Sequence, residues 1–138
     1  MRSLMLPLFL LAPVLLASCA TAPEGPPKLT EKQTQALEKA LEGKTPGDKV
    51  TCIQQYRQTN LQVISDQVLL YKVSNSLVYK NEVMGRCSGL TRGDTLITQS
   101  FGGQLCRGDI ARVANLMVGT LSGVCSLGDF VPYRRVKK

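Results

Sequence analysis

Short hydrophobic segments separated by polar, turn-forming residues characterise the chain from residue 48 onward. Six of them are rich in β-branched and aromatic residues, as strands are: VTCIQQY, LQVIS, QVLLYKV, SLVYK, DTLITQS and DFVPYRRV. The segment QVLLYKVSNSLVYKN alternates in the same way on both sides of Ser74-Asn75, which predicts a hairpin. The pattern indicates a mostly β fold, a small β-barrel or sandwich of about six strands over residues 48–138.

Glycine-containing turns punctuate these segments. The dipeptide Gly-Asp occurs at 47–48, 93–94, 108–109 and 128–129, each time before a hydrophobic run. Two of the four follow an arginine, so that Arg-Gly-Asp stands at 92–94 and 107–109. We interpret both as turns rather than adhesion motifs, because Gly-Asp recurs without the arginine. SFGGQ (100–104) lacks the lysine of a phosphate-binding loop and predicts a hairpin turn.

Two segments have helical rather than alternating spacing. Thr30 and Gln33 form a capping box before an apolar stripe of Leu37, Ala40 and Leu41, and Gly43 is a natural end, so residues 30–47 are expected to hold a short helix and a linker. The stripe is narrow, and the helix is either docked on the domain or a spacer. The apolar residues of 110–118, with Asp109 as N-cap, fit a second helix, although the sequence leaves open whether this segment is a helix or a strand.

The N-terminus has the layout of an exported protein. Arg2 precedes residues 4–17, which are all apolar and too few to span a bilayer. Leu16-Ala17-Ser18-Cys19 resembles the lipobox of bacterial lipoproteins, which predicts a signal peptide over 1–18 and a lipid, including palmitate-type acyl chains, on Cys19. An ordinary signal peptide and an uncleaved anchor are the alternatives. Residues 19–29, rich in proline, are expected to form a flexible tether.

The composition limits where the protein is expected to reside and which kinds of catalytic or metal-binding site it can contain. Ala20 stands where an aspartate would resemble the inner-membrane retention signal, so we expect the outer membrane, with the domain facing the periplasm. Without Arg2 the 17 basic residues become 16 against 10 acidic ones, a net charge of +6. The chain has no histidine, which excludes Ser-His-Asp and Cys-His nucleophiles and His-ligated metals. No catalytic, cofactor-binding or metal-binding residue is predicted, and no enzyme activity is expected.

Four cysteines remain after Cys19: Cys52, Cys87, Cys106 and Cys125. An even number in a small exported domain predicts two disulfides. A zinc site or a thioredoxin-like centre would need close Cys-x-x-Cys pairs, and the chain has none. Spacing does not choose among the three possible pairings. We favour Cys87–Cys106, as the staple of a hairpin, with Cys52–Cys125 joining the first and last strands.

The C-terminal segment YRRVKK concentrates positive charge. It is either a solvated basic end or a contact surface for an anionic partner, and its candidate contacts are Arg134, Arg135, Lys137 and Lys138. The expected periplasmic location excludes nucleic acid as the partner.

Several cysteine-containing motifs resemble a family of small proteobacterial proteins of unknown function, many of which carry lipoprotein-type signals. These motifs are GRCSGL (85–90), QLCRGDI (104–110) and CSLGDFVP (125–132), together with a Val-Ile-x-Asp turn and a Val-Tyr-x-Asn strand within 51–83. The resemblance covers residues 51–132 and implies a shared, mostly β fold with a cysteine framework. It implies no activity, cofactor or catalytic residue. The family often has proline where this chain has Ser88.

The function that we expect is a non-enzymatic envelope lipoprotein that binds a polymer, a glycolipid or another envelope protein. A second hypothesis is an inhibitor or accessory subunit of a periplasmic enzyme. A third is a hydrolase of unrecognised type, for which two carboxylates would have to meet in a cleft. Its candidates are Asp66, Glu82, Asp94 and Asp109.

Overall fold

The computed structural model describes residues 25–55 and 60–136. The predicted signal peptide, Cys19, most of the tether, Lys137 and Lys138 therefore lie outside the described residues. No helix within the described ranges is long and apolar enough to cross a bilayer.

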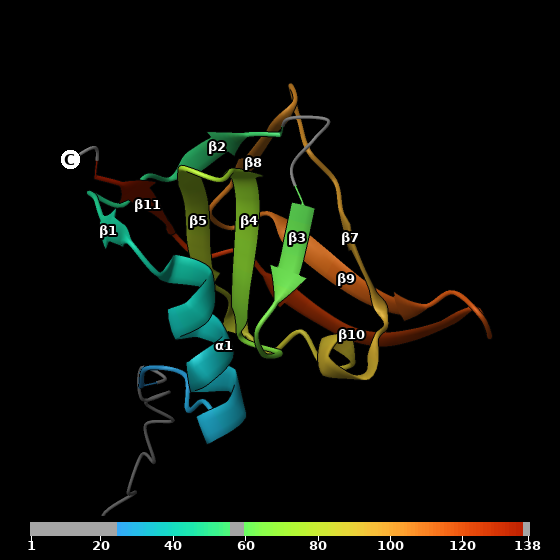
Figure 1. Ribbon diagram of the computed structural model, residues 1–138. Coiled ribbons are helices and arrows are strands. Elements are labelled where there is room, and N and C mark those ends of the chain that lie inside the picture. Colours follow the sequence, from blue (N-terminus) through green and yellow to red (C-terminus); the bar gives the residue numbers. More distant parts are fainter. Residues whose placement is uncertain (1–24, 56–59, 137–138) are drawn as a thin grey trace, which may run out of the picture.

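Antiparallel strands form three sheets (Figure 1). The largest has the order β1 (Lys44–Pro46), β11 (Phe130–Arg135), β5 (Leu77–Glu82), β4 (Val68–Ser74) and β3 (Asn60–Val63). The second has the order β6 (Met84–Gly85), β10 (Thr120–Ser126), β9 (Ile110–Asn115) and β7 (Thr95–Thr98), and β2 (Cys52–Gln54) pairs with β8 (Gln104–Cys106). The mostly β fold is confirmed, and each of the six predicted segments contains a strand. The sheets are open, and five further strands of the described residues were not predicted, among them the long β9 and β10.

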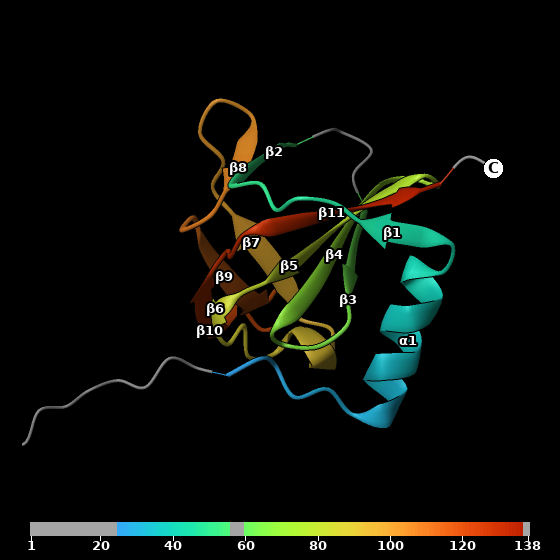
Figure 2. The same cartoon turned by 90° about the vertical axis from the view of Figure 1, so that its left-hand side faces the viewer.

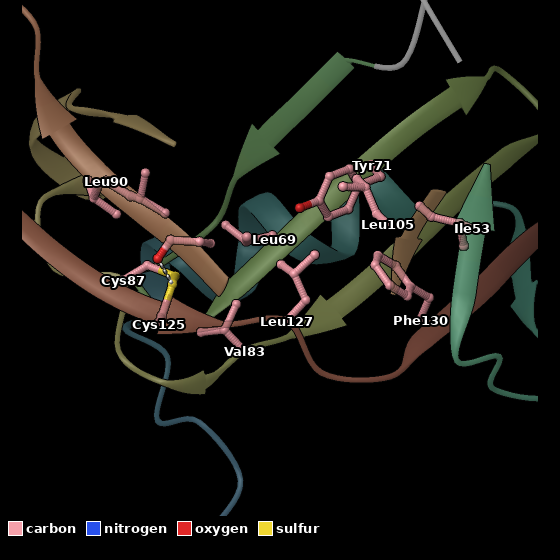
Figure 3. Packing of buried hydrophobic residues seen from close by; sticks show 12 residues of the cluster. Ile53, Leu69, Tyr71, Val83, Cys87, Leu90, Leu105, Cys125, Leu127 and Phe130 are labelled. Carbon is pink, nitrogen blue, oxygen red and sulfur yellow. Dashed lines mark hydrogen bonds between the residues drawn. A yellow bond between two sulfur atoms is a disulfide. The ribbon is translucent and has the colours of Figure 1, made fainter. Parts of the chain in front are cut away.

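The main core lies between the sheets (Figure 3). It takes Leu69 from β4, Phe130 from β11 and Val113 from β9, all of them fully buried. The ring of Tyr71 meets that of Phe130 edge to face at 5.6 Å between centroids. Burial raises the pKa of the Tyr71 phenol, whose hydroxyl has no hydrogen-bond partner among the described residues. Tyr71 is therefore a neutral core residue that contributes mainly apolar surface.

The helix α1 (Glu31–Leu41) begins with the predicted capping box, since Thr30 Oγ1 accepts from Gln33 N and Gln33 Oε1 accepts from Thr30 N. It is docked, not a spacer. Its apolar stripe of Leu37, Ala40 and Leu41 packs on a second cluster that the outer face of the large sheet supplies: Ile64, Val68, Leu70 and Val78. Figure 2 shows the resulting order of layers, with α1, the large sheet and the β6-β10-β9-β7 sheet side by side. The short 3₁₀ helix Leu90–Arg92 precedes β7.

Two disulfides brace the sheets, as the cysteine count predicted. Cys87, which follows β6, is bonded to Cys125 in β10, and both are buried in the main core. Cys52 is bonded to Cys106, and the two residues face each other in the β2–β8 ribbon with Cα atoms 4.0 Å apart.

The favoured pairing, Cys87–Cys106 with Cys52–Cys125, is wrong. It assumed that the segments around Cys87 and Cys106 are neighbouring strands of one hairpin. Instead, β8 leaves its sequence neighbours and pairs with the distant β2, so Cys106 meets Cys52. The edge strand β6 pairs with β10, with Gly85 opposite Cys125, and Cys87 follows within bonding reach.

The predicted helix at 110–118 is also wrong, because residues 110–115 form β9. Ala111 and Val113 are buried while Ile110 and Arg112 are exposed, which is a period of two. Pairing with β7 on one side and β10 on the other uses the backbone of this segment in sheet hydrogen bonds. The carboxylate of Asp109 does not cap a helix but accepts from Cys106 N at 2.7 Å.

The predicted β4–β5 hairpin and the predicted turn in SFGGQ are both present, whereas Gly47-Asp48 and Gly128-Asp129 do not form turns. The hairpin of β4 and β5 turns at Asn75-Ser76, one residue after the predicted Ser74-Asn75. In SFGGQ, Phe101 bridges to Gln104 around Gly102 and Gly103, whose positive φ angles require glycine. Both Arg-Gly-Asp carboxylates are hydrogen-bonded within the domain, since Asp94 Oδ2 accepts from Ser122 Oγ and Asp109 Oδ2 accepts from Cys106 N.

Candidate functional site: a basic groove between helix and sheet

A pocket of about 270 Å³ lies where the C-terminal end of α1 meets the large sheet. Its charged lining is entirely positive: Lys39 from α1, Lys44 from β1, Lys72 from β4 and Arg135 from β11. Gln62 and Asn75 add amide groups, and Ala40 and Val78 form an apolar part of the lining. We call this pocket the basic groove.

Sheet register explains why these residues meet. Lys72 is opposite Val78, and Val78 is opposite Tyr133, so all three side chains emerge on the face that carries α1. Arg135 follows Tyr133 by two positions and emerges on the same face. Arg134 lies between them and points to the opposite face. The two neighbouring arginines therefore serve different surfaces.

The charge of the basic groove is largely uncompensated within the described part of the chain. Lys44 Nζ donates to Ala40 O at 3.2 Å, which satisfies a carbonyl at the end of α1. Lys39, Lys72 and Arg135 form no ion pair with a described carboxylate. Like charges around one concave surface repel each other, and a bound anion would relieve that repulsion. The geometry therefore suits a partner that carries several negative charges.

A second pocket, of about 300 Å³, is larger but internally neutralised. Its three cations face two carboxylates: Asp129 is 3.5 Å from Lys49 Nζ and 3.2 Å from Arg107 Nη1, and Glu82 is 2.8 Å from Lys80 Nζ. A ligand would have to displace these ion pairs. We therefore prefer the basic groove as the candidate site.

The protonation of Lys80 follows from the same contacts. Partial burial lowers its pKa, but the hydrogen bond and the charge of Glu82, with a contribution from Tyr133, outweigh this and raise the pKa above its ordinary value. Lys80 is consequently a stable cation at neutral pH, already paired with Glu82 and not poised as a base.

The four candidate carboxylates of a hydrolase are not gathered in one pocket, and each already has a hydrogen-bond or ion-pair partner within the domain. Asp66 Oδ1 accepts from Thr91 N and Oγ1, both at 3.0 Å, so it supports the 3₁₀ helix. Asp94 Oδ2 accepts from Ser122 Oγ of β10, Asp109 accepts from Cys106 N, and Glu82 pairs with Lys80. Within residues 25–55 and 60–136, no three acidic or cysteine side chains are placed to hold a metal ion.

The sequence identified this site only in part. Of the four predicted anion contacts, Arg135 lies in the basic groove, Arg134 on the opposite face, and Lys137 and Lys138 outside the described residues. Lys39, Lys44 and Lys72 were missed. They come from three separate segments, and the only sequence signal that they contribute to is the positive net charge.

Comparison with known proteins gives one result. The model of a family of unknown function, DUF6491, matches residues 1–125. No curated protein and no solved structure matches the chain.

Proposed function

The chain belongs to DUF6491, a family of unknown function, and we propose that it is a non-enzymatic, lipid-anchored envelope protein whose basic groove binds an anionic cell-envelope polymer. The anchor is the lipid on Cys19, the membrane is the outer membrane, and the domain faces the periplasm. The acidic groups of such a polymer would be phosphates or carboxylates.

One observation carries the binding proposal: four cations and no carboxylate line the basic groove. A repeating anionic chain offers several charges at once, and the amides of Gln62 and Asn75 suit its hydroxyl and carbonyl groups. Exposed, hydrated cations of this kind bind by Coulomb attraction, and salt screens that attraction.

Neutralising the groove is expected to abolish most binding. The variant Lys39→Gln/Lys72→Gln/Arg135→Gln leaves Lys44 on its helix carbonyl and removes three ionic contacts. At about 0.5–1 kcal/mol for each exposed contact, Kd should rise roughly tenfold or more. Co-sedimentation of the oxidised mature protein with peptidoglycan sacculi and with lipopolysaccharide, at about 50 and 300 mM salt, measures the change.

The matched control is Lys28→Gln/Lys32→Gln/Arg134→Gln. It removes the same charge from exposed positions outside the groove, and it includes the arginine next to Arg135. If both triple variants lost polymer binding equally, the effect would come from net charge alone, and the basic groove would be refuted as the binding site. Loss only on removal of Lys137 and Lys138 would move the site to the tail. Absence of binding at low salt would refute binding to these polymers. It would favour the second hypothesis, in which the domain binds a protein as an inhibitor or accessory subunit.

Anchoring is tested separately. Cells fed an alkyne analogue of palmitate should label the wild-type protein and not Cys19→Ala, because only a thiol at the lipobox accepts the lipid. The unlabelled variant should leave the outer-membrane fraction. The variant Cys52→Ala/Cys106→Ala retains Cys19 and should still be labelled. The proposed anchor would be contradicted if the Cys19→Ala variant were labelled, or if the wild-type protein were not.

A further inference from the structure

The turn between β9 and β10 presents large apolar side chains to solvent. Leu116, Met117 and Val118 are 66, 93 and 69% exposed. Turns normally expose Gly, Asn, Asp and Ser, so three consecutive large apolar residues are unusual there. The whole segment 113–124 contains no charged residue. We call Leu116–Val118 the apolar tip.

Three backbone N–H groups at the apolar tip find their acceptors within the turn itself. Asn115 Oδ1 accepts from Met117 N at 3.0 Å and from Val118 N at 3.3 Å, and Asn115 O accepts from Gly119 N at 2.9 Å. Backbone donors that lack a partner are the main obstacle to placing a turn in hydrocarbon. Asn115 pairs the N–H groups of Met117, Val118 and Gly119 from within the turn, which lowers the cost of moving the tip into an apolar phase.

The adjoining outer sheet face continues the apolar surface. Ile97, Ile110, Leu121 and Val124 are all exposed. One cation interrupts them, Arg112, which lies in register between Ile97 and Val124. Arg112 is three residues from the end of β9, about 10 Å along the strand, and the apolar tip lies beyond that end. If the tip enters the acyl boundary by roughly 5–10 Å, the guanidinium lies near lipid phosphates while its aliphatic stem covers apolar surface.

We infer that the apolar tip inserts into the phospholipid bilayer that holds the anchor. The inference rests on the proposed lipid on Cys19, which keeps the domain beside a membrane. Residues 20–29, ten residues, reach at most about 36 Å, so the tip meets the bilayer at a high effective concentration and needs little affinity of its own. Figure 1 shows the end of the β9–β10 hairpin on the opposite side of the domain from β1 and the end of β11. Insertion of the tip therefore turns the basic groove away from the membrane.

A single tryptophan tests this, because the chain has none of its own. Met117→Trp is expressed with the native lipobox, reconstituted in phosphatidylethanolamine–phosphatidylglycerol vesicles, and compared with Phe101→Trp, an 82% exposed site in the β7–β8 turn. Emission from position 117 should move to shorter wavelength and lose about half its intensity to lipids brominated in the acyl chains, as expected for burial at the acyl boundary. Emission from position 101 should change in neither respect.

The outcomes of the experiment distinguish a failure of tip insertion from a failure of the lipid anchor. Water-like emission at position 117 in a lipidated, vesicle-bound protein overturns tip insertion and leaves the anchor intact. If Cys19 carries no lipid, the anchor fails, and vesicle-dependent quenching of soluble Met117→Trp still supports insertion. A blue shift without vesicles that grows with protein concentration, together with dimers in sedimentation, assigns the tip to self-association and overturns the inference. Leu116→Ser/Val118→Ser in the Met117→Trp background should abolish the quenching.

Discussion

Replacing Cys87 and Cys125 together by alanine is expected to leave the domain at or beyond the limit of folding at 37 °C. The disulfide closes a separation of 38 residues, and its loss releases about 4 kcal/mol on the chain-entropy model. Both sulfurs also lie in the main core, beside Leu127 and Val83 (Figure 3), so their removal leaves a cavity that costs roughly 1–2 kcal/mol more. The total approaches the whole stability of a small domain. Denaturant titration of the oxidised proteins measures it.

The variant Cys52→Ala/Cys106→Ala is the matched control. Its disulfide closes a longer separation, 54 residues, so loop entropy alone predicts a loss of about 4 kcal/mol as well. Cys52 is exposed and the β2–β8 ribbon lies outside the two larger sheets, so no core cavity follows. The core pair should therefore cost more. A larger loss for the Cys52–Cys106 pair would show that loop entropy outweighs burial in this fold.

Truncating Asn81 is the second large effect that we expect. Its side chain is fully buried and holds the loop between β10 and β11: Nδ2 donates to Gly128 O at 2.8 Å and Asp129 O at 3.3 Å, and Oδ1 accepts from Gly128 N at 3.0 Å. Asn81→Ala leaves the Gly128 backbone groups buried without these partners, which should cost about 3–4 kcal/mol. Thermal and denaturant unfolding against the wild type measure the loss.

Gly128→Ala should reproduce the loss from the other side of the contact, because its Cβ would collide with the Glu82 carbonyl. Gln54→Ala, at an exposed strand position, is the control and should stay within about 0.5 kcal/mol of the wild type. A loss of less than about 1 kcal/mol in Asn81→Ala would mean that water or a rearranged loop satisfies Gly128 instead.

The motifs that carry the family resemblance have structural roles in this fold. Asp66 of the Val-Ile-x-Asp turn supports the 3₁₀ helix, and Asn81 of the Val-Tyr-x-Asn strand holds Gly128. The spaced cysteines form the two disulfides. Such motifs specify the scaffold. The four cations of the basic groove and the three residues of the apolar tip, by contrast, belong to none of these motifs.

Local patterns in the sequence determined the local structure. The capping box at Thr30 and Gln33, the β4–β5 hairpin and the turn at Gly102-Gly103 each depend on residues a few positions apart, so a single stretch of chain contains all the information. The ambiguity at 110–118 was local too, since the same apolar residues fit a helical and an alternating period. Hydrogen bonding to β7 and β10 decided it in favour of a strand.

Only the tertiary structure decided which distant segments meet. The disulfide pairing followed from β8 joining β2 and β6 joining β10, contacts that residue spacing does not encode. The same holds for the candidate site. Arg134 and Arg135 are adjacent in the sequence, yet strand alternation sends one into the basic groove and the other to the opposite face. Lys39, Lys44 and Lys72 join Arg135 because α1 docks on the large sheet. Charge composition is a property of the chain, whereas a charged surface exists only after long-range packing has brought its members together.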